Sequence, residues 1–362
     1  MSISESQIQA ALQEVVDPNT GKDFMTSRCA RNIRIAGNDV TLDIELGYPA
    51  KSQIESIRKL VENKLYTIGG AGKVSVNVYT KIVSHVVQRG VKLIPGVKNI
   101  VAVASGKGGV GKSTTAVNLA LALAVEGAKV GILDADIYGP SLPLMLGIEG
   151  QPESKDGKTI EPMEAHGIQT MSIGFLVSKD TPMVWRGPMV TQALQQLLKD
   201  TQWRDLDYLI VDMPPGTGDI QLTLAQQVPV TGAVIVTTPQ DIALLDAIKG
   251  LKMFEKVGIP ILGVVENMSI HICSNCGHEE HVFGSGGASR LAQDNEVEVL
   301  GALPLDIHIR EQTDAGNPTV VADPQGRVAE IYRDIARQVA IRIAERAKDM
   351  TSKFPNIVVQ NT

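Results

Sequence analysis

A glycine-rich segment followed by lysine and serine offers the clearest chemistry in the sequence. Residues 106–113 read Gly-Lys-Gly-Gly-Val-Gly-Lys-Ser and match the pattern G-x-x-x-x-G-K-[ST]. The glycines allow the backbone to curl so that successive N–H groups point at phosphate oxygens. Lys112 is expected to reach the β- and γ-phosphates of ATP, and Ser113 to bring its hydroxyl to Mg²⁺. The predicted nucleotide-binding residues are Gly106, Lys107, Gly108, Gly109, Val110, Gly111, Lys112, Ser113 and Thr114.

The surroundings of this segment favour a nucleotide site over a glycine-rich turn with two solvated lysines. An apolar run at Ile100–Ala104 precedes it, and a helical pattern at Thr114–Val125 follows it. A strand, a glycine loop and a helix in this order place the phosphates at the positive end of the helix. We therefore predict ATP binding here.

Three aspartates follow apolar runs, and they suit the metal ion and the water of a nucleotide site. Asp212 ends the run Tyr208–Val211, a pattern that holds Mg²⁺ directly or through water. Asp134 and Asp136 stand at the end of an earlier run. One of these two can orient the water that attacks the γ-phosphate, and the other can equally be a strand-end cap. The predicted Mg²⁺ ligands are Ser113 and Asp212.

Cys273 and Cys276 form a C-x-x-C pair that leaves several interpretations open. A redox pair needs a helix N-terminus directly after its first cysteine, whereas Gly277 and the polar residues beyond it indicate a loop. A metal site needs four ligands, of which this pair supplies half. His271, His278 and His281 could complete a zinc site, but His278 and His281 follow Cys276 more closely than the histidines of zinc fingers do. We expect the three histidines in loops or on the surface.

A second copy of the chain offers a simpler way to complete a metal site. Two chains that each contribute Cys273 and Cys276 form a four-thiolate site on a two-fold axis. Such a site accepts a [4Fe–4S] cluster or a structural zinc ion. The sequence therefore predicts both cysteines as metal ligands in a homodimer, and a pair without metal is the remaining interpretation.

The pattern of the chain changes near residue 99, which predicts two domains. Residues 1–80 show helical spacing around Ile8, with Asp17-Pro18 as the predicted end of that helix, and an alternating hairpin at Asn32–Leu46, followed by a second helix and a strand. We predict a small α+β domain with the order helix, strand, strand, helix, strand. Residues 81–98 contain two glycines and a proline and form the predicted linker. The second domain is assigned to residues 99–350 and a C-terminal tail to residues 351–362.

The second domain alternates apolar strands with helical patterns. The predicted strands are Ile100–Ala104, Val130–Leu133, Tyr208–Val211, Ala233–Thr237 and Ile261–Val265. Apolar runs without alternation suit parallel strands that helices cover on both faces. We therefore predict an α/β fold with a doubly wound parallel sheet of the P-loop NTPase kind, in which ligands bind at the carboxyl ends of the strands.

The composition excludes several classes of function. A net charge of −6 gives no general affinity for nucleic acid or acidic lipid. Three cysteines are too few for a disulfide scaffold and suit a reducing compartment. The most apolar stretch, residues 116–133, contains charged residues and cannot span a bilayer, and the first residues show no basic-then-apolar signal. We expect a cytoplasmic protein that binds neither nucleic acid nor membrane.

The phosphate loop as a whole resembles the deviant Walker A loop of MinD, ParA and the nitrogenase iron protein. In that group, the lysine at the place of Lys107 reaches the phosphates of the partner subunit in a homodimer. The resemblance gives Asp136 the place that positions water. Lys107, Lys112 and Asp136 are therefore the predicted catalytic residues. Asp212–Asp219, rich in proline and glycine, is similar to the group's second switch, which rearranges when the γ-phosphate is lost.

Several motifs in combination resemble the Mrp/ApbC family of iron–sulfur cluster carriers. They lie at residues 106–113, 134–141, 185–188, 212–219, 238–241, 266–268 and 273–276. The resemblance implies a homodimeric ATPase that holds a labile [4Fe–4S] cluster, with an assembly scaffold as donor and apo-proteins as recipients. It also implies that Asn267 lies near the adenine base. Residues 1–80 resemble the small domain of iron–sulfur assembly factors, but their cysteine is Cys29 rather than a residue beside Pro49.

Two other functions fit part of the sequence. A spatial-organising ATPase of the MinD or ParA kind binds membrane or DNA, and apolar residues at helical spacing within residues 327–348 could form an amphipathic membrane helix. A helix packed on the sheet explains the same spacing. The second alternative is an ATPase dimer with structural zinc. Because a C-x-x-C pair has no role in a spatial organiser, we predict the cluster carrier.

Overall fold

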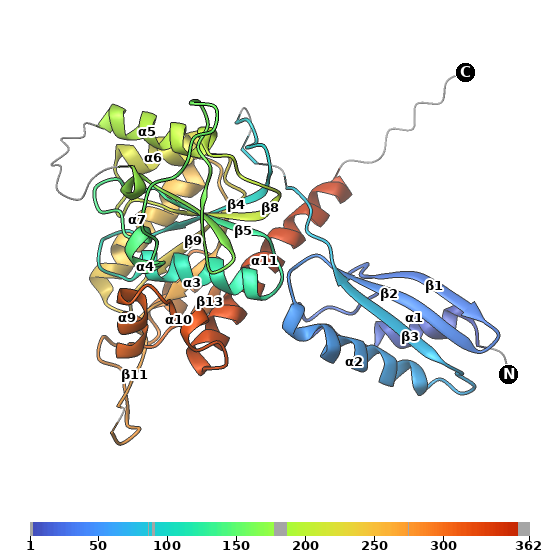
Figure 1. Ribbon diagram of the computed structural model, residues 1–362. Helices are drawn as coiled ribbons and strands as arrows, with labels where there is room; N and C mark the ends of the chain where they lie inside the picture. Colours follow the sequence, from blue (N-terminus) through green and yellow to red (C-terminus); the bar gives the residue numbers. More distant parts are fainter. Residues whose placement is uncertain (1–2, 86, 89–90, 177–186, 274, 354–362) are drawn as a thin grey trace. The chain divides into compact units, whose positions relative to one another are not determined.

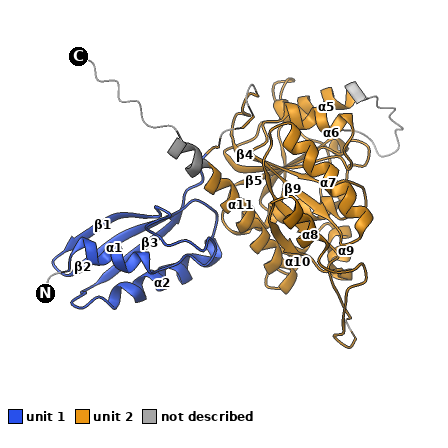
Figure 2. Ribbon diagram, turned by 180° about the vertical axis from the view of Figure 1, so that it is seen from behind, with its two compact units in different colours: residues 1–83 blue, residues 84–362 orange. Residues whose placement is uncertain are grey.

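The computed structural model describes residues 3–85, 87–88, 91–176, 187–273 and 275–353 of the chain. The chain divides into two units, Met1–Val83 and Ser84–Thr362 (Figure 2). The phosphate-loop motif and the cysteine pair both fall in the second unit.

The first unit is a small α+β fold built on a three-stranded sheet. Its elements are α1 (Glu5–Gln13), β1 (Ala30–Ala36), β2 (Asp39–Leu46), η1 (Lys51–Gln53), α2 (Ile54–Tyr66) and β3 (Val74–Thr80). Strand β1 is antiparallel to β2, and β2 is parallel to β3. Alternate residues of β2 are buried, because successive side chains of a strand point to opposite faces. The predicted order of helix, strand, strand, helix and strand is confirmed.

The end of α1 was predicted too late. The sequence places the stop at Asp17-Pro18, but the helix ends at Gln13. Three residues later the chain already runs beside another segment, since Val16 forms a bridge with Asp23. A proline marks a residue where a helix cannot continue, whereas this tertiary pairing ends it earlier.

The second unit contains the remaining elements. In chain order they are β4 (Val97–Ala104), α3 (Lys112–Val125), β5 (Val130–Asp134), α4 (Leu142–Met145), β6 (Met163–Ala165), β7 (Ile168–Ser172), η2 (Ile173–Phe175), α5 (Gly187–Asp200), β8 (Leu206–Asp212), α6 (Asp219–Gln227), β9 (Gly232–Thr237), α7 (Asp241–Lys256), β10 (Ile261–Glu266), β11 (His271–Ile272), β12 (Glu279–Glu280), α8 (Gly287–Asp294), β13 (Val299–Ala302), α9 (Ile307–Asp314), α10 (Thr319–Ala322) and α11 (Arg327–Lys353).

An eight-stranded sheet forms the centre of this unit, with the strand order β13-β10-β9-β4-β8-β5-β7-β6. All neighbouring pairs are parallel except β6 and β7. Helices α3 and α11 lie on one side of the sheet, and α5, α6 and α7 lie on the other (Figure 1). The prediction of a doubly wound, mainly parallel α/β fold is therefore confirmed, and ligands are expected at the carboxyl ends of the strands.

The central strands match the predicted runs, and the strands near the edges were missed. Strands β4, β5, β8, β9 and β10 contain all five predicted runs, and most of their residues are buried. Strands β6, β7 and β13 were not predicted. They are short and mix polar or exposed residues with apolar ones, as in the burial pattern of β13, where Val299 is exposed and Leu300 buried. A partly exposed edge strand lacks the continuous apolar run that identifies a central one.

Candidate functional site: a phosphate loop and a cysteine hairpin

The phosphate loop joins β4 to α3 at the predicted position. Gly109 and Gly111 both have φ +80°, a left-handed conformation that side chains disfavour. Gly111 is the N-cap of α3, so the unpaired N–H groups of that helix face the loop. A side chain at Gly106 would overlap the backbone of Asp246 in α7. The motif thus needs glycine both for the curl of its backbone and for its close contact with a neighbouring helix.

Lys112 and Asp212 form a buried ion pair beside the loop. The Lys112 ammonium donates to Asp212 Oδ1 at 2.5 Å and lies 3.1 Å from Ser113 Oγ. Burial raises the pKa of Asp212, and the neighbouring Lys112 charge opposes this effect. The pair brings together residues that are one hundred positions apart in the sequence.

The same residues fit a Mg²⁺ ion. The second carboxylate oxygen of Asp212, Oδ2, is buried and has no hydrogen-bond partner among the described residues. A buried carboxylate oxygen without a partner is costly, and a cation removes that cost. Together with the Ser113 hydroxyl it offers the oxygen ligands that Mg²⁺ prefers.

Asp134 is fully buried at the end of β5 and holds the following loop in place. Its Oδ1 accepts the N–H of Asp136 at 3.1 Å, and its Oδ2 accepts the N–H of Ser141 at 3.0 Å and the hydroxyl of Ser172 at 3.1 Å. Burial and the nearby charge of Asp212 raise the pKa of Asp134 to about 7. Of the two aspartates between which the sequence left the choice open, this one has the contacts of a strand-end cap.

Asp136 and Lys107 lie at the same end of the sheet as the buried pair. Asp136 is half-buried, and its charge is close enough to raise the pKa of Asp212. Lys107 is also half-buried, and its carbonyl accepts the hydroxyl of Ser105 at 2.8 Å. The structure therefore brings Lys112, Ser113, Asp136 and Asp212 together around one point. No described residue forms an ion pair with Lys107.

The cysteine pair lies in a short hairpin between β11 and β12. The N–H of Cys273 donates to the carbonyl of His278 at 2.9 Å, and the N–H of Gly277 donates to the carbonyl of Cys273 at 2.8 Å. Gly277 has a φ of +70°, which this tight turn requires. Among the residues described after the first cysteine, the next element is the strand β12 and no helix begins before it. The loop prediction is thus confirmed, and the geometry of a helical redox pair is absent here.

The two thiols are accessible and chemically suited to binding metal. Cys273 is half-buried and Cys276 is exposed. Hydrogen bonds from the backbone N–H groups of Asn275 and Cys276 lower the pKa of the Cys273 thiol, which favours the thiolate. Within the described part of the chain, no group of three or more histidine, cysteine or acidic side chains could hold a metal ion. The described residues of one chain therefore provide two thiolate ligands but not the rest of a metal site.

Two histidines hold the base of the hairpin rather than joining the cysteines. His271 Nδ1 donates to the carbonyl of Leu305 at 3.1 Å, and His281 Nδ1 donates to the carbonyl of Ser269 at 2.8 Å. His278 is exposed at the turn. The expectation that the histidines lie in loops or on the surface fits His278 and His281, whereas His271 is half-buried in β11.

Asn267 follows β10 and contacts the phosphate loop. Its Nδ2 donates to the carbonyl of Val110 at 2.9 Å, and its side chain is buried. The residues alone gave no sign of this contact, and only the motif at residues 266–268 drew attention to Asn267. Ser172, which holds Asp134, was missed because nothing in its local sequence marks it.

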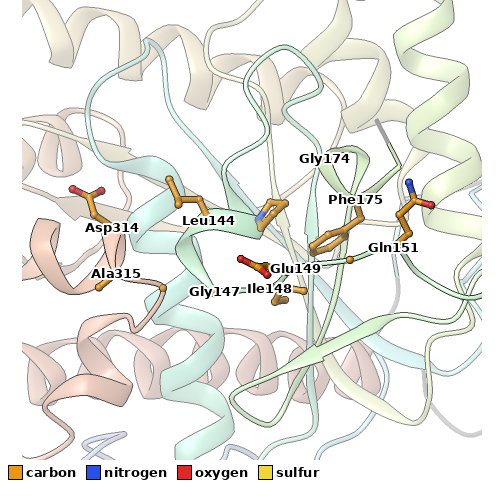
Figure 3. A pocket seen from close by; sticks show the side chains of 12 residues that line it. Leu144, Gly147, Ile148, Glu149, Gln151, Gly174, Phe175, Asp314 and Ala315 are labelled. Atoms are coloured by element: carbon orange, nitrogen blue, oxygen red, sulfur yellow. The ribbon is translucent and has the colours of Figure 1, made fainter. Parts of the chain in front are cut away.

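A separate cavity of about 490 Å³ opens between α4, η2 and the end of α9. Leu144, Phe175 and Asp314 are among its lining residues (Figure 3). None of the predicted site residues lines it.

Of the predicted family motifs, Trp185-Arg-Gly-Pro188 begins outside the described residues, at Trp185 and Arg186.

The chain matches known families over both of its units. The profile described as "NUBPL iron-transfer P-loop NTPase" matches residues 96–340, and the one described as "Iron-sulfur cluster assembly protein" matches residues 5–78. The "Iron-sulfur cluster carrier protein" of Pseudomonas fragi is 61% identical over 279 residues, covering 76% of this chain and 97% of that relative. The protein of the same name from Escherichia coli K12 is 57% identical over 312 residues, or 85% of each chain.

A solved structure supports the same relationship. The nucleotide-binding protein of Archaeoglobus fulgidus in complex with ADP is 39% identical, with a TM-score of 0.56 over 64% of this chain and 90% of that chain. The P-loop NTPase profile, which matches residues 96–340, covers the phosphate loop, the aspartates and the cysteine hairpin, all within the second unit. The chain is thus a P-loop ATPase of the NUBPL and Mrp/ApbC family of iron–sulfur cluster carriers, as its motifs predicted.

Proposed function

We propose that this ATPase binds a [4Fe–4S] cluster between two copies of itself and transfers it to apo iron–sulfur proteins, with an assembly scaffold as the donor. The names of its relatives support the carrier role. The observation that carries the proposal is the accessible pair Cys273 and Cys276, which stands in the same unit as an assembled phosphate loop and has no further metal ligands among the described residues of its own chain.

The cluster is the cargo of the protein, and the hairpin suits a cargo that must leave. Two hairpins related by a two-fold axis supply the four thiolates of a [4Fe–4S] cluster. The lowered pKa of Cys273 favours the thiolate that binds iron. Exposure of Cys276 leaves the cluster accessible to an acceptor protein.

The residues around the phosphate loop bind and hydrolyse ATP. The backbone N–H groups of residues 106–114 cradle the phosphates, and Lys112 turns from Asp212 toward the β- and γ-phosphates. Ser113 and Asp212 hold Mg²⁺, which neutralises charge on the phosphates when it is bound. Asp136 orients the attacking water, and Asp134 fixes the backbone that carries Asp136. Asn267 lies beside the adenine base.

The dimer links these two sites in function. Lys107 reaches the phosphates of the partner subunit, which fits its lack of an ion pair among the described residues. Hydrolysis then changes the relative stability of two dimer states, so turnover is slow and acts as a switch. Residues 1–80 form the accessory domain, residues 81–98 the linker and residues 351–362 the tail of this carrier.

The C-terminal helix supports a carrier over a membrane-bound organiser. Helix α11 buries Ile335, Val339 and Ile343, and Arg337 pairs with buried Glu126, the residue that follows α3, at 2.6 Å. A helix whose apolar face is already covered has nothing left to insert into a lipid surface. In the described part of the chain, no helix is both long and apolar enough to cross a bilayer.

Anaerobic purification and reconstitution, followed by iron, sulfide and zinc analysis, test the proposal directly. We expect about two iron and two sulfide per chain, which corresponds to one bridging [4Fe–4S] cluster per dimer. Transfer is then measured as the activation of an apo-enzyme that requires a [4Fe–4S] cluster. About half a zinc per chain and no iron would contradict the carrier and favour a structural zinc site.

A further inference from the structure

A short segment, Asn267–Ser269, leads from β10 directly into the cysteine hairpin. One end of it touches the phosphate loop and the other end closes the base of the hairpin. Only a few residues separate Asn267 from Cys273. The segment is therefore the shortest covalent route between a residue in contact with the phosphate loop and the thiols.

At the nucleotide end, Asn267 fits tightly against the loop. Its Nδ2 donates to the Val110 carbonyl at 2.9 Å, and a Cβ placed on Gly111 would lie 2.1 Å from this nitrogen. The backbone N–H of Asn267 also donates to the Thr237 carbonyl of β9 at 2.8 Å. Because the contact has no spare room, a shift of Val110 and Gly111 on phosphate binding must move the Asn267 side chain or break its hydrogen bond.

The middle of the segment has an unusual backbone conformation. Met268 has a φ of +56°, which residues other than glycine adopt uncommonly. The N–H of Met268 donates to Oδ1 of Asn267 at 2.9 Å, so the same amide that contacts the loop also fixes the next peptide. A residue held in a sparsely populated conformation by its surroundings relaxes when those surroundings change.

At the hairpin end, Ser269 holds both strands of the hairpin base. Its N–H and its hydroxyl donate to the Leu303 carbonyl, each at 2.9 Å, and its own carbonyl accepts His281 Nδ1 at 2.8 Å. His281 follows β12, on the far side of the cysteine turn. A rotation of the Met268 peptide would therefore act on the two strands that present Cys273 and Cys276.

We propose that Asn267 is a positioning residue that transmits the nucleotide occupancy of the phosphate loop to the cysteine hairpin through Met268, Ser269 and His281. The inference rests on the proposed function insofar as the two thiols are the cluster ligands. This route is separate from the loop Asp212–Asp219, which follows β8 and is distant from the hairpin in the sequence and in the strand order. Nucleotide binding thus changes how the thiols are presented before any ATP is hydrolysed.

The test measures the alkylation rates of Cys273 and Cys276 in the cluster-free full chain, with and without saturating Mg²⁺–ATP. Peptide mass spectrometry separates these thiols from the buried Cys29. In the unsubstituted chain we expect the nucleotide to change the rate by about fivefold or more, the low end of common coupling energies. In Asn267→Ala and in His281→Ala, the ratio of the alkylation rates with and without Mg²⁺–ATP falls toward one.

Asn295→Ala is the matched control, because among the described residues Asn295 bonds only to the helix α8 that precedes it, with Nδ2 donating to the Leu291 carbonyl at 2.9 Å. It keeps the response of the unsubstituted chain. His281→Ala decides the outcome if Asn267→Ala no longer binds ATP, since His281 contacts no predicted nucleotide ligand. A nucleotide response retained in His281→Ala, or no response in the unsubstituted chain, overturns the inference. If Mg²⁺–ATP changes the alkylation rates but the chain binds no iron on reconstitution, the proposed carrier function is refuted. The coupling between the phosphate loop and the hairpin would then still stand.

Discussion

The phosphate site and the cysteine site of this chain are built in opposite ways. The phosphate site is assembled from three strands and a helix, and its central pair, Lys112 and Asp212, is almost fully buried. The cysteine site is a small turn on a two-stranded hairpin, and Cys276 is exposed. The first takes Lys112 and its predicted Mg²⁺ ligands from one chain and gains only the partner's Lys107, whereas the second offers two ligands where a tetrathiolate metal site needs four.

This difference indicates which site needs a second copy to complete its set of metal ligands. A buried site can be preorganised by its own fold, and it then acts on a ligand that diffuses in. A half-site on an exposed turn costs little to build and can release its cargo when two copies separate. Substitutions that affect ATP hydrolysis and metal binding unequally can test this difference between the two sites.

The largest effect is expected from Lys112→Ala. Removal of the ammonium that reaches the phosphates should lower the ATP hydrolysis rate by about 10³-fold. The iron content after reconstitution should not change, because the hairpin keeps its thiols. Steady-state ATPase assays and iron analysis measure the two effects. Lys129→Ala, which removes an exposed lysine paired with Asp205, is the control and should leave both values unchanged. Loss of iron in Lys112→Ala would show that the two sites are not independent in metal binding.

Asp136→Asn should lower the hydrolysis rate by about 10²-fold, because the water loses the carboxylate that orients it. ATP affinity, measured by titration with a fluorescent analogue, should stay unchanged. Asp134→Asn is the informative comparison, since Asp134 holds the N–H groups of Asp136 and Ser141. It should weaken both affinity and hydrolysis. Equal effects of the two substitutions would argue against a specific role for Asp136.

Cys276→Ala should lower the reconstituted iron content by at least about tenfold, because the cluster loses two of its four thiolates in the dimer. ATP binding should persist. Cys29→Ala serves as the matched control, since this buried cysteine lies in the first unit and should leave the iron content unchanged. Stoichiometric iron in Cys276→Ala would rule out the bridging cluster.

Leu119→Ala should lower the free energy of unfolding by about 2–5 kcal/mol, because Leu119 of α3 is fully buried. Denaturant titration measures this value. The helix carries the phosphate loop at its N-terminus, so ATP affinity should also fall. An unchanged affinity at a temperature where the variant is folded would mean that the loop does not depend on the packing of α3.

The smallest effect is expected from His278→Ala. His278 is exposed at the turn, so the free energy of unfolding should change by less than about 0.5 kcal/mol. The metal content should also stay the same if the thiolates are the only protein ligands. A loss of iron or zinc in this variant would identify His278 as a metal ligand. The hairpin would then supply more than two ligands per chain.

Much of the fold was predictable because its central strands are short, continuous apolar runs. The runs at Val101 and Ile210 are buried on both faces by helices, so their residues carry the signal themselves. The edge strands β6 and β13, and β7 beside β6, were not predicted, since pairing with a neighbour rather than composition makes them strands. The end of α1 was missed for a similar reason.

The sequence by itself determined the chemistry of this protein. The spacing of Gly106–Ser113 and of Cys273 and Cys276 specifies a phosphate loop and a pair of thiolates, because local backbone geometry requires those residue types. Only the tertiary structure decided which distant residues meet. It paired Lys112 with Asp212, gave Asp134 the task of holding a loop, and set Asn267 against Val110. Such contacts depend on the order and register of the strands in the sheet, which no local pattern encodes.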